Sequence, residues 1–319
     1  MPLDLSIIIP CHNRSDLLRA CLASVIRHMP PGTEVIAVDD GSPNATASQA
    51  AAEFIGVRSI RLSKQSGFCV AVNAGIHAAQ HPIIELLNDD TEVSAGWANA
   101  ALAWFRQPAV GAVAPLVLCW PGGDIGTARI DSAGDRYYWG GIATKWHRGT
   151  VLRESHLKAR RVFGASGSSA FYRRDLLLHV GGFPESFGAY FEDVDLAFRI
   201  HRAGYEVIHE PASRVLHHVS ASHGRISRKL LEQQSRNEER VFWRNLPMAV
   251  LVRSLPAHFA VLAAKAARRW REGNLLPFLR GRARAWSELA AFMRHRRQMN
   301  QLGPADAPRR WFVEERYWG

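Results

Sequence analysis

Residues 35–42, VIAVDDGS, contain the feature that decides the fold, an apolar run that ends in two aspartates. Such a run, closed by a turn, is typical of a buried parallel strand. The arrangement recurs at residues 83–91, IIELLNDDT, and a third acidic cluster, EDVD, stands at residues 192–195. In an open α/β sheet ligands bind beyond the carboxyl ends of the strands. Acids there can hold a divalent cation, and the cation can hold a diphosphate, so the pattern predicts an enzyme acting on a nucleotide-diphosphate compound.

Apolar runs alternate with helical stripes along the first part of the chain. This alternation predicts βαβ units and an α/β fold with a mostly parallel sheet. Residues 121–165 lack clear periodicity, and we expect long loops and short antiparallel strands over the site there. The predicted strands are 5–9, 34–38, 57–62, 83–87, 110–115, 205–208 and 214–218, and the predicted helices include 67–79, 94–105, 174–180 and 191–203.

The positive charge is concentrated in the last third of the chain. Residues 1–222 contain 20 Lys and Arg against 21 Asp and Glu, whereas residues 223–319 contain 20 against 8. We therefore predict a catalytic domain over 1–222 and a basic, mainly helical extension over 223–319, with the boundary within 222–245. A basic segment suggests an anionic partner such as membrane phospholipid, nucleic acid or an acidic substrate, and a merely solvated basic face is the alternative.

The extension also carries apolar side chains beside its arginines. A helix predicted over 283–293 groups Trp286, Leu289 and Met293 on one face, with arginines around it, Arg282, Arg284 and Arg294. This composition suits the surface of an anionic membrane, although a helical cap on the catalytic domain or on a second subunit is the alternative. No recognised motif supports binding of nucleic acid.

Cellular location is predicted from what the chain lacks. The four cysteines form no C-x-x-C pair and suggest a reduced, cytosolic protein. The chain enters a strand almost at once, so we expect no signal peptide. Residues 248–267 are interrupted by charged residues and a proline, so we expect this segment to lie on a membrane rather than to span it. We thus expect a cytoplasmic protein, peripheral on the cytoplasmic face of the inner membrane.

An ordered set of motifs resembles a known family. The chain resembles the family 2 glycosyltransferases, inverting enzymes with the GT-A fold, and in its last two motifs their bacterial rhamnosyltransferase-like branch. The resemblance covers residues 4–245 and implies a Rossmann-like sheet with a smaller antiparallel part. The matching segments are SIIIPCHNR at 6–14, VDDGS at 38–42, GFCVAVNAG at 67–75, LNDDT at 87–91, EDVD at 192–195, HHVSAS at 217–222 and SRNE at 235–238.

The resemblance implies a set of residues that bind the nucleotide of the donor. Asp40 would accept a hydrogen bond from N3 of uracil or thymine. His12 and the backbone of Pro10 would lie beside the base, and Asn73 would lie near it. A loop residue that bonds the backbone is the alternative for His12.

The resemblance also implies a metal site that holds Mn²⁺ or Mg²⁺. Residues 88–90, Asn-Asp-Asp, stand where the family has its D-x-D-type motif. Asp90 would meet the metal, and Asp89 would bind the ribose or a metal-bound water. His217 fits a third ligand, with His218 as the alternative because adjacent strand residues face opposite ways. Without the other motifs, the two acids could equally cap the following turn.

Asp193 is the expected catalytic base. Inversion needs an acceptor hydroxyl activated on the face opposite the leaving group, and a carboxylate within hydrogen-bond reach does this. Glu192 could instead hold that role or orient the acceptor. Asp195 is expected to be structural and to pair with Arg199 four residues on.

These inferences predict a metal-dependent glycosyltransferase of the hexosyltransferase type. It would move a sugar from a UDP or dTDP donor to a glycan or lipid-linked acceptor in cell-envelope or surface polysaccharide synthesis. The resemblance points to dTDP-rhamnose as one such donor. A homo-oligomer is possible. Two other classes compete: a non-catalytic binding or assembly subunit that keeps the fold, and a nucleotidyltransferase. The latter generally carries a basic glycine-rich loop after the first strand, whereas Cys11-His12-Asn13 follows it here.

Overall fold

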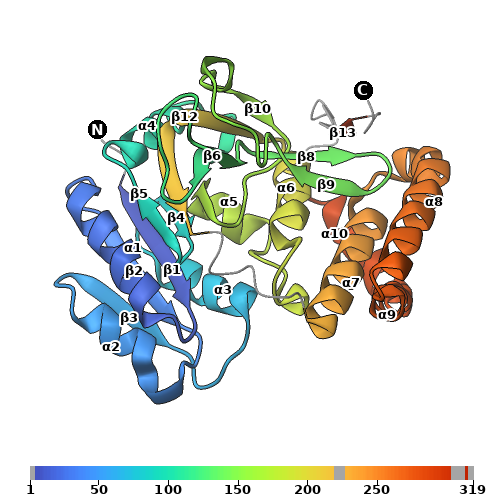
Figure 1. Cartoon of the computed structure of the whole chain (residues 1–319), viewed down its shortest axis with the longest axis horizontal. Coiled ribbons are helices and arrows are strands. Elements are labelled where there is room, and N and C mark those ends of the chain that lie inside the picture. The colour runs from blue at the N-terminus through green and yellow to red at the C-terminus, as the bar shows by residue number, and fades with distance from the viewer. Residues whose placement is uncertain (1–3, 219–226, 303–312, 315–319) are drawn as a thin grey trace.

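The computed structural model describes residues 4–218, 227–302 and 313–314. A twisted main sheet forms the body, and the C-terminal helices stack at one end of it (Figure 1). The strands run in the order β10-β12-β6-β11-β4-β1-β2-β3, with β5 paired to β12 and β7 paired to β6. They are β1 (Leu5–Cys11), β2 (Glu34–Asp39), β3 (Val57–Arg61), β4 (Ile83–Leu87), β5 (Thr91–Val93), β6 (Val110–Cys119), β7 (Ile130–Ser132), β10 (Arg160–Val162), β11 (Ser169–Arg173) and β12 (Glu206–His217).

The predicted α/β fold is confirmed. β1 lies between β2 and β4 and is parallel to both, and β2 pairs in parallel with β3. The carboxyl ends of β1, β2 and β4 therefore meet at one edge, as the runs of apolar residues followed by acids require. The helices between the strands are α1 (Ser15–His28), α2 (Thr46–Ala52), α3 (Phe68–Ala78), α4 (Trp97–Trp104), α5 (Arg174–His179) and α6 (Glu192–Arg202).

The small residues of α3 let this helix approach the sheet closely. A Cβ added at Gly75 would lie 2.4 Å from Cγ2 of Ile8 on β1, so no larger residue fits without movement. Both faces of the sheet are covered by buried apolar side chains, one cluster under α3 and α6 and another under α1 and α4. This packing fixes the strand ends that carry the acids.

The last strand of the sheet is longer than the sequence predicted. β12 is continuous from Glu206 to His217, where two strands, 205–208 and 214–218, were expected. Its register against β6 shifts between Glu210 and Arg214. Pro211 lies in that shift and has no N–H to donate, so it breaks the apolar pattern without ending the strand.

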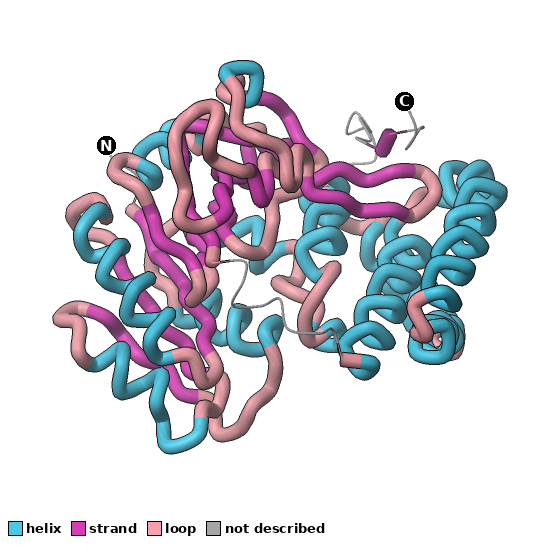
Figure 2. Tube along the Cα trace, in the orientation of Figure 1, coloured by secondary structure: helices cyan, strands magenta, loops and turns pink. Residues whose placement is uncertain are grey.

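Residues 121–165 form the expected loops and short strands (Figure 2). Two of these strands, β7 and β10, pair antiparallel with β6 and β12 of the main sheet. β8 (Asp135–Tyr138) and β9 (Ile142–Lys145) form an antiparallel hairpin, to which β13 (Val313–Glu314) adds in parallel.

The C-terminal extension is mainly helical between residues 228 and 299, as expected, but a helix boundary predicted from the sequence differs from the observed one. The single helix predicted over 283–293 is wrong, because one helix ends at Trp286 and the next begins at Leu289. Met248–Arg271 is long and apolar enough, by length and composition alone, to cross a membrane, and only 17% of its most apolar stretch is buried. The extension contains α7 (Arg228–Asn245), α8 (Met248–Arg271), α9 (Leu275–Trp286) and α10 (Leu289–Met299).

Candidate active site

Asp89 and Asp90 follow β4 at the carboxyl edge of the sheet, and both side chains are buried. Arg14, at the start of α1, reaches them from the neighbouring strand end. Its Nη1 lies 3.1 Å from Oδ2 of Asp90 and 3.7 Å from Oδ1 of Asp89. Burial raises the pKa of Asp89 to about 6, although a hydrogen bond from Cys11 opposes the shift.

His217, the last residue of β12, faces this pair of acids. Its Nε2 lies 3.2 Å from Oδ1 of Asp90, and its Nδ1 lies 3.0 Å from Oδ2 of Asp131 on β7. The adjacent His218 points elsewhere: its Nε2 lies 2.9 Å from Oε1 of Glu92, and its ring stacks on Trp120. Between the two candidate histidines, the structure thus brings His217 to Asp90.

The Asp90–His217 pair fits a divalent cation. Two ligands at a right angle around an ion at about 2.1 Å lie about 3 Å apart, close to the separation of these two atoms. Mg²⁺ is usually held by one or two protein ligands together with substrate phosphates. Among the described residues no group of three or more His, Cys, Asp or Glu side chains is arranged to hold a metal ion, so a cation would need ligands from the donor or from water.

Asp131 is a site residue that the motifs did not identify. It is buried between His217 and Lys145, whose Nζ lies 2.8 Å from its Oδ2. Burial opposes ionisation, but the hydrogen bond to His217 and the charge of Lys145 hold the pKa of Asp131 well below its usual range. A carboxylate bound to one imidazole nitrogen orients the other toward a metal. Asp131 lies in the aperiodic segment 121–165, where only its acidic character could have marked it.

Asp193 stands in the first turn of α6, against the small-residue segment 164–169. Its Oδ2 accepts a hydrogen bond from the backbone N–H of Gly167 at 2.9 Å. The backbone N–H of Asn88 in turn donates to the carbonyl oxygen of Ser168 at 3.0 Å, which joins this segment to the end of β4. The metal-site acids and the expected base are therefore parts of one connected edge.

Glu192 is buried beside Asp193. Burial, together with the negative charge of Asp193, raises the pKa of Glu192 well above its usual range. A carboxyl group that keeps its proton cannot accept another, so this environment favours Asp193 as the base. Burial also raises the pKa of Asp135, a further acid of β8 near Asp193 that carries no sequence motif.

The turn before α6 is strained. Tyr190 and Phe191 have φ values of 71° and 68°, a left-handed conformation that non-glycine residues rarely adopt. Asn237 of α7 is fully buried against this turn and holds it in place. Its Nδ2 donates to three carbonyl oxygens of the turn, those of Phe187, Ala189 and Tyr190, at 2.9, 3.1 and 2.9 Å. The SRNE motif marked Asn237, but the sequence assigned it no role.

The expected base-binding residues lie at the ends of β1 and β2. Both carboxylate oxygens of Asp40 accept backbone hydrogen bonds, from Ser66 at 2.6 Å and Gly67 at 2.9 Å. Nδ1 of His12 lies 2.8 Å from the carbonyl oxygen of Asp40, and Pro10 is buried opposite Val38 in the sheet. The structure thus brings Pro10, His12 and Asp40 together.

The side-chain amide of Asn73 binds the loop after α5. Its Oδ1 accepts from the N–H of Phe183 at 2.8 Å, and its Nδ2 donates to the carbonyl oxygen of the same residue at 2.9 Å. The amide therefore fastens α3 to the loop after α5. Residues 219–222 of the HHVSAS motif lie outside the described residues.

The prediction that Asp195 is structural agrees with its contacts. Its Oδ2 lies 3.0 Å from Nε of Arg199, and its Oδ1 lies 3.0 Å from Nε of Arg244 on α7. Arg282, expected on the polar rim of a membrane-facing helix, is instead buried and pairs with Glu238 and Glu239 of α7.

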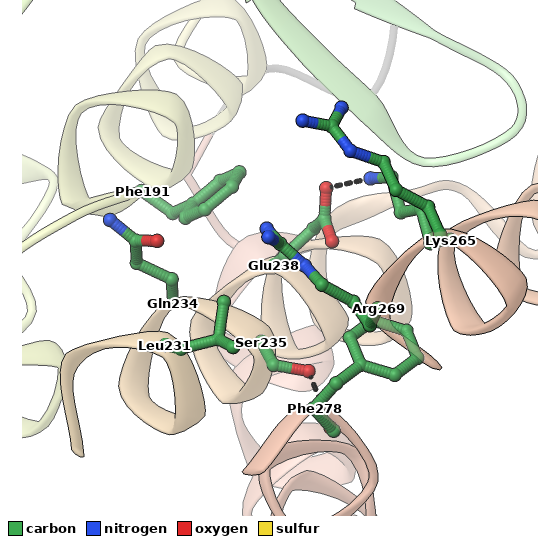
Figure 3. A pocket seen from close by; sticks show the side chains of 9 residues that line it. Phe191, Leu231, Gln234, Ser235, Glu238, Lys265, Arg269 and Phe278 are labelled. Atoms are coloured by element: carbon green, nitrogen blue, oxygen red, sulfur yellow. Dashed lines mark hydrogen bonds and ion pairs between the residues drawn. The ribbon is translucent and has the colours of Figure 1, made fainter. Parts of the chain in front are cut away.

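A pocket of about 140 Å³ lies outside this edge, between α7, α8 and α9 (Figure 3). Leu231 and Phe278 line it with the basic residues Lys265 and Arg269, and Lys265 is paired with Glu238. Phe191 also contributes to the wall, but none of the predicted site residues does.

Known proteins resemble this chain in sequence and in fold. The family model described as glycosyl transferase family 2 matches residues 6–181. The chain is 31% identical over 229 residues to N-acetylglucosaminyl-diphospho-decaprenol L-rhamnosyltransferase of Mycobacterium tuberculosis, covering 65% of this chain and 74% of the relative. It is 32% identical over 234 residues to protein y4gI of Sinorhizobium fredii, covering 69% of this chain but only a quarter of that longer protein.

A solved structure shares the fold. The structure of GalNAc-T7 with UDP, GalNAc and Mn²⁺ superimposes with a TM-score of 0.58 at 20% identity, over 74% of this chain and 48% of that one. At that identity the likeness establishes the GT-A fold alone. The family match extends over more than half of the chain, from the first strand to the loop after α5. The chain therefore belongs to glycosyl transferase family 2 and is a glycosyltransferase.

Proposed function

We propose that the chain is a metal-dependent, inverting transferase that moves a sugar from a UDP or dTDP donor to an acceptor hydroxyl, with dTDP-rhamnose as the leading donor. The observation that carries this proposal is the pairing of Asp90 with His217 at the same sheet edge that holds Asp193. Asp90 and His217 suit a cation that binds the donor diphosphate. Asp193 suits the activation of the acceptor hydroxyl, which is the nucleophile. The mycobacterial relative is named as a rhamnosyltransferase, which supports the choice of sugar.

On the donor side, Asp90 and His217 would hold Mn²⁺ or Mg²⁺. The bound cation would neutralise the charge that develops on the departing nucleoside diphosphate. Asp40, His12 and the backbone of Pro10 would bind the base. Asp131 would keep Nε2 of His217 directed at Asp90 by accepting the hydrogen bond from Nδ1.

On the acceptor side, Asp193 would take the proton of the hydroxyl as its oxygen bonds to the anomeric carbon. The bond from that carbon to the diphosphate oxygen breaks, and its electron pair leaves with the nucleoside diphosphate. Attack opposite the leaving group inverts the anomeric configuration. The hydrogen bond from Gly167 orients the carboxylate without neutralising it.

We further propose a lipid-linked glycan as the acceptor, in cell-envelope or surface polysaccharide synthesis at the cytoplasmic face of the inner membrane. The name of the mycobacterial relative includes a diphospho-decaprenol acceptor, which supports this class. The basic C-terminal extension supports an anionic membrane as partner.

The test is release of nucleoside diphosphate from UDP-, dTDP- and GDP-sugars with Mn²⁺, Mg²⁺ or EDTA. We expect metal-dependent release from one donor, lost in Asp90→Ala and Asp193→Asn but kept in Asp16→Ala, an exposed surface acid. Release of pyrophosphate would instead indicate a nucleotidyltransferase. Failure to bind any free nucleotide would favour a non-catalytic subunit.

A further inference from the structure

α8 carries its large apolar side chains on the solvent side. Met248, Val252, Phe259 and Trp270 are 55%, 57%, 53% and 73% exposed. At 100° per residue these four positions lie within about 40° of one another around the helix axis. Pro256 and Ala263, also exposed, lie near the same line. The outer side of α8 is thus one apolar stripe about 33 Å long.

The inner side of the same helix is firmly held, by apolar packing of Leu251 and Leu255 on the core and by polar contacts. Nε2 of His258 lies 3.3 Å from Oε1 of Glu239, and Nδ1 of His258 lies 3.0 Å from the carbonyl oxygen of Gly140. Lys265 points into the protein and pairs with Glu238, as Figure 3 shows. A helix on the surface of a globular protein normally turns its apolar side inward and a polar side to the solvent. The outer apolar stripe of α8 departs from this pattern, because the helix is already packed on the protein through its inner side.

These inner contacts also indicate whether α8 would cross a bilayer or lie in the plane of its surface. Crossing a bilayer would place the Lys265–Glu238 pair and His258 in hydrocarbon or separate them from α7, and either is costly. Lying in the interface would bury the outer stripe and leave every inner contact intact. Figure 1 shows α8 at the end of the molecule farthest from the N-terminal strands, where a flat surface can reach it.

The charges around the outer stripe of α8 favour a lipid surface over a second copy of the chain as its partner. Arg253 and Arg271 flank the stripe on its exposed side, and exposed arginines continue on α9 and α10, among them Arg280, Arg284 and Arg294. A two-fold interface would bring the same flanking arginines of both copies near one another. Anionic headgroups would neutralise them.

We propose that α8 lies in the plane of an anionic bilayer, with the stripe Met248–Val252–Phe259–Trp270 buried at the level of the upper acyl chains and the flanking arginines at the phosphates. This proposal rests on the membrane partner proposed above and names its contact surface. It puts the membrane on the helical extension rather than on the carboxylate edge of the sheet.

The test measures partitioning of the full chain onto vesicles of phosphatidylcholine with and without phosphatidylglycerol. In Val252→Asp/Phe259→Asp we expect partitioning onto anionic vesicles to fall about tenfold or more, because two apolar anchors become charged. Ile55→Asp is the matched control, since Ile55 is fully exposed in the turn before β3 and lies off the stripe. It should partition like the unchanged chain. Circular dichroism and nucleotide affinity should be the same in all three proteins.

A second variant separates charge from apolar burial. Arg253→Gln/Arg271→Gln should weaken binding to anionic vesicles but leave the weaker binding to neutral ones unchanged. The proposal is overturned if the unchanged chain ignores anionic vesicles, or if the double aspartate variant still binds them normally. It is also overturned if that variant only converts a dimer to a monomer in sedimentation. Nucleotide binding is measured separately, so failure here is distinct from failure of the transferase proposal.

Discussion

Asp40 and Asp193 are held differently from three acids of the helices, Asp195, Glu238 and Glu239. At the edge, Asp40 and Asp193 accept hydrogen bonds from backbone amides, which fix a carboxylate but leave its charge in place. In the helices, Asp195, Glu238 and Glu239 are buried against arginine and lysine side chains. The contrast suggests that the first group is available to a ligand, whereas the second serves the fold. Substitutions in each group should therefore affect different measurements.

The largest expected effect is on activity, from Asp193→Asn. An amide cannot take a proton from the acceptor hydroxyl, so turnover should fall by about 10²–10⁴-fold. The free energy of unfolding should change by less than about 1 kcal/mol, since the bond to Gly167 can be kept. Steady-state kinetics and urea unfolding measure the two effects. A variant that stays active would assign the base to another group, Glu192 first.

The next effect is on stability, from Asp195→Asn. The change leaves Arg199 and Arg244 buried without their anionic partner, which costs about 3–5 kcal/mol. Urea unfolding measures it, and Glu53→Ala, which breaks an exposed pair with Arg19, is the control at below about 1 kcal/mol. If both variants lose the same free energy of unfolding, the buried ion pairs of Asp195 contribute no more to stability than an exposed pair does.

The sequence predicted the sheet better than it predicted the support of the site. Continuous apolar runs such as 35–38 specify buried strands, and the acids that end them specify the edge. Asp131 could not be placed, because the sequence of residues 121–165 has no periodicity and the contact of Asp131 with His217 joins residues far apart in sequence. The role of Asn237 was equally hidden, since a buried amide that binds backbone carbonyls has no local pattern.

Asn237→Ala tests whether a helical residue can also serve the site. Loss of its hydrogen bonds should let the strained turn at Tyr190 and Phe191 relax and move Asp193. Turnover should fall by about tenfold to a hundredfold, because small misplacements of a catalytic group are costly. The donor KM should stay the same, since the bonds of Asn237 go to the turn before α6. Gln233→Ala, which removes other bonds to the same turn, should have a smaller effect.

Asp131→Asn should weaken the proposed metal site without removing a ligand. An amide can donate to Nδ1 of His217 and so favour the wrong tautomer, and affinity for Mn²⁺ should fall by about ten- to a hundredfold. Titration followed by electron paramagnetic resonance measures this without any turnover. Glu92→Gln is the matched control, because Glu92 contacts the adjacent His218. If both variants bind Mn²⁺ equally well, His217 is not oriented by Asp131.

Glu85 belongs to neither group, and its effect is confined to the pH dependence of stability. It is fully buried on β4 and accepts hydrogen bonds from Trp97 and Ser169. Burial raises its pKa to about 8, although these two hydrogen bonds oppose the shift. The folded state thus binds the proton more tightly than the unfolded chain, whose glutamates titrate near 4.3. Its contribution to stability is complete below the unfolded pKa and is lost as the pH rises toward about 8.

Glu85→Gln should therefore flatten the dependence of stability on pH between about 5 and 8, by at most about 1.4 kcal/mol per pH unit. Urea unfolding at a series of pH values measures this slope, and Glu53→Gln, an exposed acid, is the control. A slope that is the same in Glu85→Gln and in the unchanged chain would mean that the buried carboxyl is ionised throughout. The hydrogen bonds from Trp97 and Ser169 would then be enough to hold the buried Glu85 carboxylate without a cation, as backbone amides hold Asp40 and Asp193.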